Sequence, residues 1–125
     1  MSGANLLVVE DDAELLQVMA RALEAAGYAV ARAANGETGL RQFRAEPPDL
    51  VVCDIVLPDR DGIELIPEMR RLHPGVKILA ISGRQHIGAL NVLNLAQKLG
   101  ADGALAKPFG MEALVALAGA LLEPA

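Results

Sequence analysis

The stretch LVVCDIVLPDRDG, residues 50–62, decides the fold class. Its first five residues form a continuous apolar run that ends on a carboxylate, Asp54, and a loop with a proline and a glycine follows. A short apolar run without polar alternation is typical of a strand covered on both faces. Apolar residues then recur at helical spacing over residues 63–72, with Pro67 early in the segment as a candidate kink. The pattern predicts a strand, a loop and a helix.

The same alternation runs along the whole chain. Further strands are predicted at residues 6–9, 28–32, 76–81 and 104–106, and further helices at 15–26, between Asn35 and Pro47, in the later part of 83–99, and at 111–122. Gly27 and Gly100 are candidate helix stops, and Asn35 is a candidate helix cap. Five strands alternating with five helices indicate an α/β, doubly wound (βα)5 fold, a three-layer sandwich with helices on both faces of a parallel sheet.

Length and composition limit the class of protein and its partners. A chain of 125 residues predicts one domain over 1–125, and 53% hydrophobic residues exclude a disordered chain. The net charge of −5, without a basic cluster, argues against nucleic acid and anionic membrane surfaces as partners. The single cysteine, Cys53, favours a reducing compartment and suits a small core residue. The first apolar run has no positive charge before it and three acidic residues after it, a pattern that does not predict a signal peptide. The apolar run Ala113–Leu122 is about half the ~20 residues of a bilayer span, so we expect a cytoplasmic protein.

Charged and hydroxyl side chains stand where the predicted strands end. Glu10 and Asp11 follow the first strand, Asp54 and Ser82 end the third and fourth, and Lys107 follows the fifth. Parallel strands bring these ends to one edge, where such folds bind ligands. Carboxylates about 4 Å apart repel by about 4 kcal/mol at an effective dielectric near 20, so three together either raise one another's pKa values or demand a cation. Oxygen ligands without His or Cys select a hard divalent ion, and we expect Mg²⁺. A hydroxyl and an ammonium beside it suit phosphoryl oxygens.

Taken singly, these residues have ordinary structural interpretations. Asp11 with Glu14 fits a helix capping box, Ser82 suits a local backbone contact, and Lys107 suits the surface. Taken together at one sheet edge, they favour metal binding, and Asp12 then becomes the helix cap.

Four pieces of the chain match one family in order. They are LVVEDD at 7–12, DIVLPDRDG at 54–62, ISG at 81–83 and GADGALAKPF at 100–109. The sequence resembles the receiver domain of bacterial two-component response regulators over nearly its whole length. This resemblance implies a flavodoxin-like sheet with strand order 2-1-3-4-5.

The resemblance also implies a role for each site residue. Asp54 is the implied phosphoacceptor, and its donor is a sensor histidine kinase or a phosphotransfer protein. Ser82 and Lys107 contact the phosphoryl group, and a cis Lys107–Pro108 peptide aims the lysine. Such a domain is no enzyme in the usual sense, because it promotes only its own phosphorylation and dephosphorylation. The implied Mg²⁺ ligands are Glu10, Asp11, Asp54 and the backbone carbonyl of Val56.

The chain departs from the family on its output side. Ala104 stands where an aromatic side chain usually reports phosphorylation, and the interval from Ser82 to Lys107 is longer than usual. We expect the backbone of 83–87 to move in place of an aromatic flip.

By resemblance, Val56 and Arg84 stand at positions that tune hydrolysis of the phosphoryl group. His86 lies in the loop after Ser82, where a role near that group is an alternative to a surface position.

The last predicted helix is strongly apolar, with Glu112 as its only charge between Gly110 and Glu123. Its inner face leaves Val115 and Leu122 outside, near Ala104 and Leu90 or Leu93. That surface predicts a homodimer or a target interface, and scattered surface residues are the alternative. The inner face comprises Leu114, Leu117, Ala118 and Leu121.

Three alternatives remain for the function. The chain is a receiver that works by binding an unknown protein target, a receiver fragment of a larger regulator or hybrid kinase, or a receiver-fold interaction module independent of phosphorylation. A flavin protein of the same topology is disfavoured, because Glu10, Asp11 and Asp12 would repel its phosphate.

Overall fold

A computed structural model describes residues 3–83, 86–87 and 90–123. The elements are β1 (Asn5–Val9), α1 (Ala13–Ala25), β2 (Ala29–Ala33), α2 (Gly36–Ala45), β3 (Leu50–Asp54), α3 (Gly62–Leu72), β4 (Lys77–Ser82), β5 (His86–Ile87), β6 (Leu90–Asn91), α4 (Val92–Lys98), β7 (Gly103–Ala106) and α5 (Met111–Leu122).

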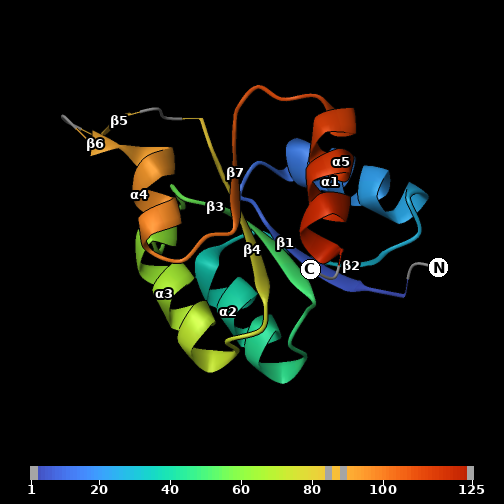
Figure 1. The fold of residues 1–125 in the computed structure, drawn as a ribbon, viewed down its shortest axis with the longest axis horizontal. Coiled ribbons are helices and arrows are strands. Elements are labelled where there is room, and N and C mark those ends of the chain that lie inside the picture. Colours follow the sequence, from blue (N-terminus) through green and yellow to red (C-terminus); the bar gives the residue numbers. More distant parts are fainter. Residues whose placement is uncertain (1–2, 84–85, 88–89, 124–125) are drawn as a thin grey trace.

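Five strands form one parallel sheet in the order β2-β1-β3-β4-β7 (Figure 1). β7 is the fifth strand of this sheet, because β5 and β6 form a separate pair. The doubly wound fold and the predicted order 2-1-3-4-5 are therefore confirmed. The bounds of these five strands differ from the sequence prediction by at most one residue at each end. Apolar runs located them well because a strand covered on both faces has little room for polar residues.

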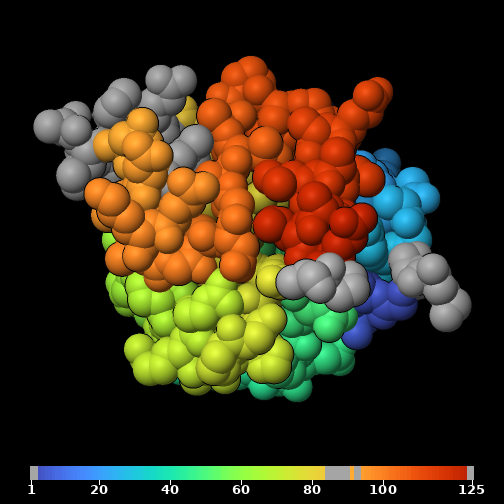
Figure 2. All heavy atoms as spheres, in the orientation of Figure 1, coloured from blue at the N-terminus to red at the C-terminus, as the bar shows by residue number. Residues whose placement is uncertain are grey.

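Helices cover both faces of the sheet, as Figure 1 shows. Successive residues of β3 point to opposite faces, so Val51 and Cys53 join the core beneath α2, α3 and α4. Leu50 and Val52 join the core beneath α1 and α5. Figure 2 shows α3, α4, β7 and α5 together on one face of the molecule.

The helix ends follow the predicted signals. Asn35 caps α2 by accepting a hydrogen bond from Thr38 N at 2.8 Å. Gly27 and Gly100 have φ of 104° and 121°, the left-handed region that glycine adopts without steric cost. Pro67 lies inside α3, which continues past it.

The segment between β4 and α4 was predicted least well. It contains the short antiparallel pair β5–β6, which the sequence pattern did not predict, and α4 spans only Val92–Lys98. The proposed motion of 83–87, and the side chains of Arg84, His86, Leu90 and Leu93, lie outside the described residues.

The prediction for α5 is wrong in one respect. Val115 and Leu122 are half-buried against the core shared with α1, because α5 packs beside α1 as well as on the sheet. The exposed positions of α5 are mostly small or acidic. Within the described residues, none of the helices is long and apolar enough to cross a membrane.

Candidate functional site

The strand ends bring the predicted site residues to one edge of the sheet. Glu10 directly follows β1, and Asp54 and Ser82 are the last residues of β3 and β4. Lys107 directly follows β7, and its backbone N–H donates to Ser82 O at 2.8 Å. The parallel pairing of β1, β3, β4 and β7 thus collects side chains that are far apart in the sequence.

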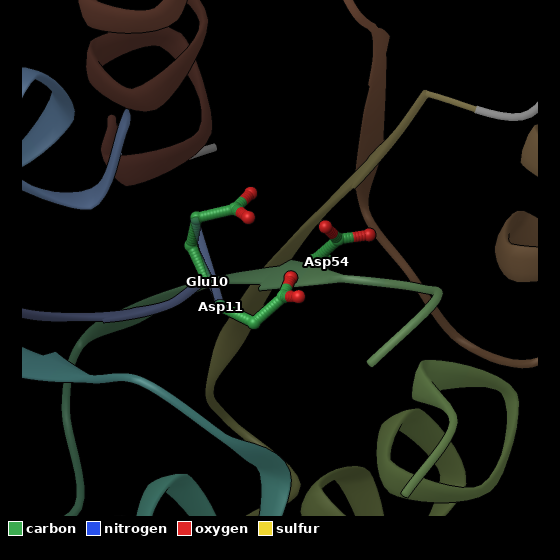
Figure 3. A group of neighbouring side chains, drawn as sticks. All are labelled: Glu10, Asp11 and Asp54. Atoms are coloured by element: carbon green, nitrogen blue, oxygen red, sulfur yellow. The ribbon is translucent and has the colours of Figure 1, made fainter. Parts of the chain in front are cut away.

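Three carboxylates form the acidic part of the site (Figure 3). Glu10, Asp11 and Asp54 each offer an oxygen, and these oxygens lie within 4.8 Å of one another. Glu10 and Asp54 are almost completely buried, at 0% and 3% exposure, whereas Asp11 is exposed. The site is therefore a buried acidic floor that opens to solvent at Asp11.

Lys107 neutralises part of this charge. Its Nζ lies 2.8 Å from Asp54 Oδ2 and 2.7 Å from Glu10 Oε1, so one ammonium bridges both buried carboxylates. The Lys107–Pro108 peptide is cis, as the resemblance implied. The remaining formal charge of the four groups is negative.

The local environment shifts two pKa values. Burial raises the pKa of Glu10, and the nearby Asp54 charge adds to the rise against the opposing effect of Lys107. Burial lowers the pKa of Lys107, but its contacts with Asp54 and Glu10 outweigh this effect and raise the pKa overall. The lysine is therefore a permanent cation in the site at neutral pH.

Backbone donors orient the acidic side chains. Asp12 N donates to Glu10 Oε2 at 2.9 Å, and Val56 N donates to Asp54 Oδ1 at 3.0 Å. Gly62 closes the following loop by donating its N–H to Ile55 O at 2.6 Å. A Cβ on Gly62 would lie 2.6 Å from Ile55 Cα, so this close approach requires glycine.

The helix cap resolves the alternative interpretation of Asp11. Asp12 Oδ1 accepts hydrogen bonds from Glu14 N and Leu15 N at 3.0 and 3.1 Å, so Asp12 is the N-cap of α1. The capping-box interpretation of Asp11 is wrong, and its carboxylate stays beside Glu10 and Asp54.

The donor set fits a hard divalent cation. All the candidate side-chain ligands are oxygens, which Mg²⁺ prefers. Glu10 Oε1 is buried and, although it is ion-paired with Lys107, it lacks an aligned hydrogen bond. A dication would offset the negative charge that Lys107 leaves uncompensated.

Comparison with known proteins identifies the family. The family model described as "Response regulator receiver domain" matches residues 6–118. The chain belongs to this family. Its members are signalling domains of two-component systems rather than a known catalytic family.

Relatives of this receiver domain agree with the assignment. The DNA-binding transcriptional regulator NtrC of Rhizobium meliloti (strain 1021) is 36% identical over 99% of this chain and 25% of its own length. The receiver domain spans a quarter to about half the length of the curated relatives it matches.

Solved structures have the same fold. A CheY-like receiver domain protein from Methanospirillum hungatei JF-1 is 30% identical, with a TM-score of 0.89 over 96% of this chain and 94% of that one. A response regulator protein from Burkholderia pseudomallei, solved with a phosphorylated aspartic acid, a calcium ion and citrate, is 34% identical. Its TM-score is 0.81 over 90% of this chain and 65% of that one.

Sequence reasoning missed the residues that hold the loop after Asp54. Asp59 accepts hydrogen bonds from Gly36 N and Glu37 N at the start of α2, and Arg60 ion-pairs with Glu37. The sequence shows only a charged, loop-forming stretch here. No local pattern predicts that Asp59 binds backbone groups 22 and 23 residues earlier in the chain.

One prediction about the surroundings is confirmed. Cys53 is completely buried, and burial raises the pKa of its thiol to about 12, so it is a core residue. Ala104 was predicted near the outer surface of the last helix, but it is half-buried against the core under α4, whereas Val115 and Leu122 pack with the core on the other face of the sheet. That Ala104 removes the aromatic readout stays a prediction.

Proposed function

We propose that this receiver domain accepts a phosphoryl group on Asp54, in the presence of Mg²⁺, from a sensor histidine kinase or a phosphotransfer protein. The observation that carries the proposal is the Asp54 carboxylate, which is buried at a strand end beside Lys107, Glu10 and Asp11. The phosphorylated aspartic acid of the Burkholderia relative supports the same chemistry.

In the proposed reaction, an Asp54 carboxylate oxygen attacks phosphorus. The bond from phosphorus to the histidine nitrogen of the donor breaks, and that nitrogen keeps the electron pair. Asp54 then carries an acyl phosphate. The N–H of Val56 orients the carboxylate by holding Oδ1 at 3.0 Å, which leaves Oδ2 beside the ammonium of Lys107.

Each remaining residue has a proposed part in binding. Lys107 pairs with the incoming phosphoryl oxygens, and the Ser82 hydroxyl donates a hydrogen bond to one of them. Mg²⁺, when bound, would neutralise charge on the phosphoryl group during transfer. Its proposed protein ligands are Glu10, Asp11, Asp54 and the backbone carbonyl of Val56.

Intact-mass spectrometry tests the proposal directly. After incubation with Mg²⁺ and acetyl phosphate, we expect the wild-type protein to gain one phosphoryl group. Asp54→Asn and a chelator should each abolish the gain. Asp61→Asn is the matched control, because Asp61 is exposed and makes no side-chain cap hydrogen bond.

The phosphorylation-independent interaction module is the opposing outcome. A folded wild-type protein that gains no phosphoryl group would contradict the proposed chemistry. A gain that survives in Asp54→Asn would place the modification elsewhere and contradict the role of Asp54.

The proposed output is binding to another protein or to a further part of a longer regulator, in the cytoplasm. A homodimer through α5 remains a proposal, and the half-buried Val115 and Leu122 weaken its apolar basis. The exposed residues of α5 include Ala113, Ala116 and Ala120. Sedimentation with and without acetyl phosphate tests it: a monomer in both states at high concentration would exclude the dimer.

A further inference from the structure

Asp59 ties the loop after the proposed phosphoacceptor to a different helix. Its Oδ1 accepts a hydrogen bond from Gly36 N at 2.8 Å, and its Oδ2 accepts one from Glu37 N at 2.9 Å. The first N–H groups of a helix have no partner within the helix, and they favour a negative charge. One carboxylate on the 55–61 loop therefore satisfies two of these groups at the start of α2.

The packing around this contact is close. A Cβ on Gly36 would lie 3.0 Å from Arg60 Cβ and 3.3 Å from Asp59 Oδ1, so the loop sits where a side chain would otherwise be. Arg60 adds ion pairs with Glu37 at 3.2 Å and with Glu68 at 2.8 Å. The two N–H donors also lower the pKa of Asp59, so it remains ionised at neutral pH.

The same loop carries the group that orients Asp54. Val56, three residues before Asp59, donates its N–H to Asp54 Oδ1. The two ends of the loop are held by backbone bonds, from Ile55 N to Ile81 O and from Gly62 N to Ile55 O. Between these ends, the Asp59 carboxylate joins the loop to the backbone of α2.

We propose that Asp59 is a positioning residue for the acidic site, holding the 55–61 loop on the start of α2 so that Val56 and Asp54 keep the geometry that binds Mg²⁺. The inference rests on the proposed function, because it assigns Asp54 and Val56 to the metal. Asp59 touches neither the metal nor the phosphoryl group in this proposal. It acts only through the loop.

Asp59 and Asn35 form a natural matched pair for the test. Both accept hydrogen bonds from backbone N–H groups in the first turn of α2, but Asn35 precedes the helix in the chain and holds no part of the loop. Loss of either cap should destabilise α2. Only the loss of Asp59 should change the site.

The experiment measures Mg²⁺ affinity by isothermal titration calorimetry, together with the melting temperature of each protein. We expect Asp59→Ala to weaken Mg²⁺ binding by about tenfold, the lower range for residues that orient metal ligands. Asn35→Ala should lower the melting temperature comparably and leave the Mg²⁺ affinity unchanged. Asp59→Asn retains one acceptor oxygen and should recover part of the affinity.

A second variant perturbs the contact between the 55–61 loop and the start of α2 while Asp59 itself is unchanged. In Gly36→Ala, the added Cβ would lie 3.0 Å from Arg60 Cβ and 3.3 Å from Asp59 Oδ1, so it crowds the loop, and we expect Mg²⁺ binding to weaken again. Unchanged affinity in Asp59→Ala, or an equal loss in Asn35→Ala, would overturn the inference while leaving the proposed function intact. If the wild-type protein itself binds no Mg²⁺, the proposed function fails, and the inference fails with it.

Discussion

Replacing Asp54 with Asn should stabilise the metal-free protein, although it removes the proposed phosphoacceptor. The substitution keeps the shape of the side chain and removes one of three clustered negative charges. Asp54 attracts Lys107 at 2.8 Å and repels Glu10 and Asp11, each of which has one carboxylate oxygen within 4.8 Å of an Asp54 oxygen.

Coulomb's law gives the size of these interactions. At an effective dielectric near 20, the attraction is about 6 kcal/mol and each repulsion is about 3.5 kcal/mol. Asp11 is exposed, so solvent weakens its repulsion, and the charge interactions of Asp54 with its neighbours nearly cancel or remain slightly attractive. The cost of burying the Asp54 charge then decides the direction. Burying the Asp54 charge, at 3% exposure, costs free energy that the neutral Asn avoids. Lys107 is not left unpaired in the variant, because it still forms its ion pair with Glu10.

Circular dichroism during heating measures the melting temperature of each protein, first with a chelator and then with Mg²⁺. In a domain of this size, each 1 kcal/mol corresponds to about 4 °C, so relief of the burial cost should make Asp54→Asn melt several degrees higher in the chelator. Mg²⁺ at a hundred times its dissociation constant stabilises the wild type by about 2.7 kcal/mol. The variant has lost a charged ligand and should gain less, so the order of the melting temperatures should reverse.

The exposed Asp61 provides the control for a general charge effect. Asp61→Asn should change the free energy of unfolding by no more than about 0.5 kcal/mol. An Asp54→Asn protein that melts below the wild type in the chelator would refute the reasoning, because it would show that the attraction to Lys107 dominates the site.

Three further predictions concern stability. Lys107→Ala should lower the free energy of unfolding by about 3 kcal/mol in urea denaturation, since it leaves two buried carboxylates without their counter-ion; an unchanged midpoint would contradict the bridging role. Gly62→Ala should cost about 1–3 kcal/mol in the same assay, because the new Cβ would lie 2.6 Å from Ile55 Cα; wild-type stability would contradict the close approach. Burial raises the pKa of Cys53 from 9.0 to about 12, so as the pH rises the thiol loses its proton in the unfolded chain before it does so in the folded protein. The free energy of unfolding should then fall by roughly 1 kcal/mol more between pH 8 and pH 10 in the wild type than in Cys53→Ala, and equal slopes would contradict the shift.

Local patterns predicted most of the fold. Continuous apolar runs marked the five strands of the parallel sheet, and Asn35, Gly27 and Gly100 marked helix ends that the structure confirms. The β5–β6 pair escaped prediction because two-residue strands are too short to show a periodicity. The sequence did not predict the partial burial of Val115 and Leu122, because it depends on the tertiary packing of α5 beside α1.

The sequence by itself determined which groups meet at the site. Polar residues directly after apolar strands must gather at one edge once the strands pair in parallel, so Glu10, Asp11, Asp54, Ser82 and Lys107 followed from their place in the chain.

Only the tertiary structure decided how these groups are held. The bridge from Lys107 to two carboxylates and the cap that Asp59 places on α2 join residues between 22 and 97 positions apart in the chain. The physical reason is that such pairings depend on distances set by packing, whereas strands, helices and caps depend on neighbours a few residues away.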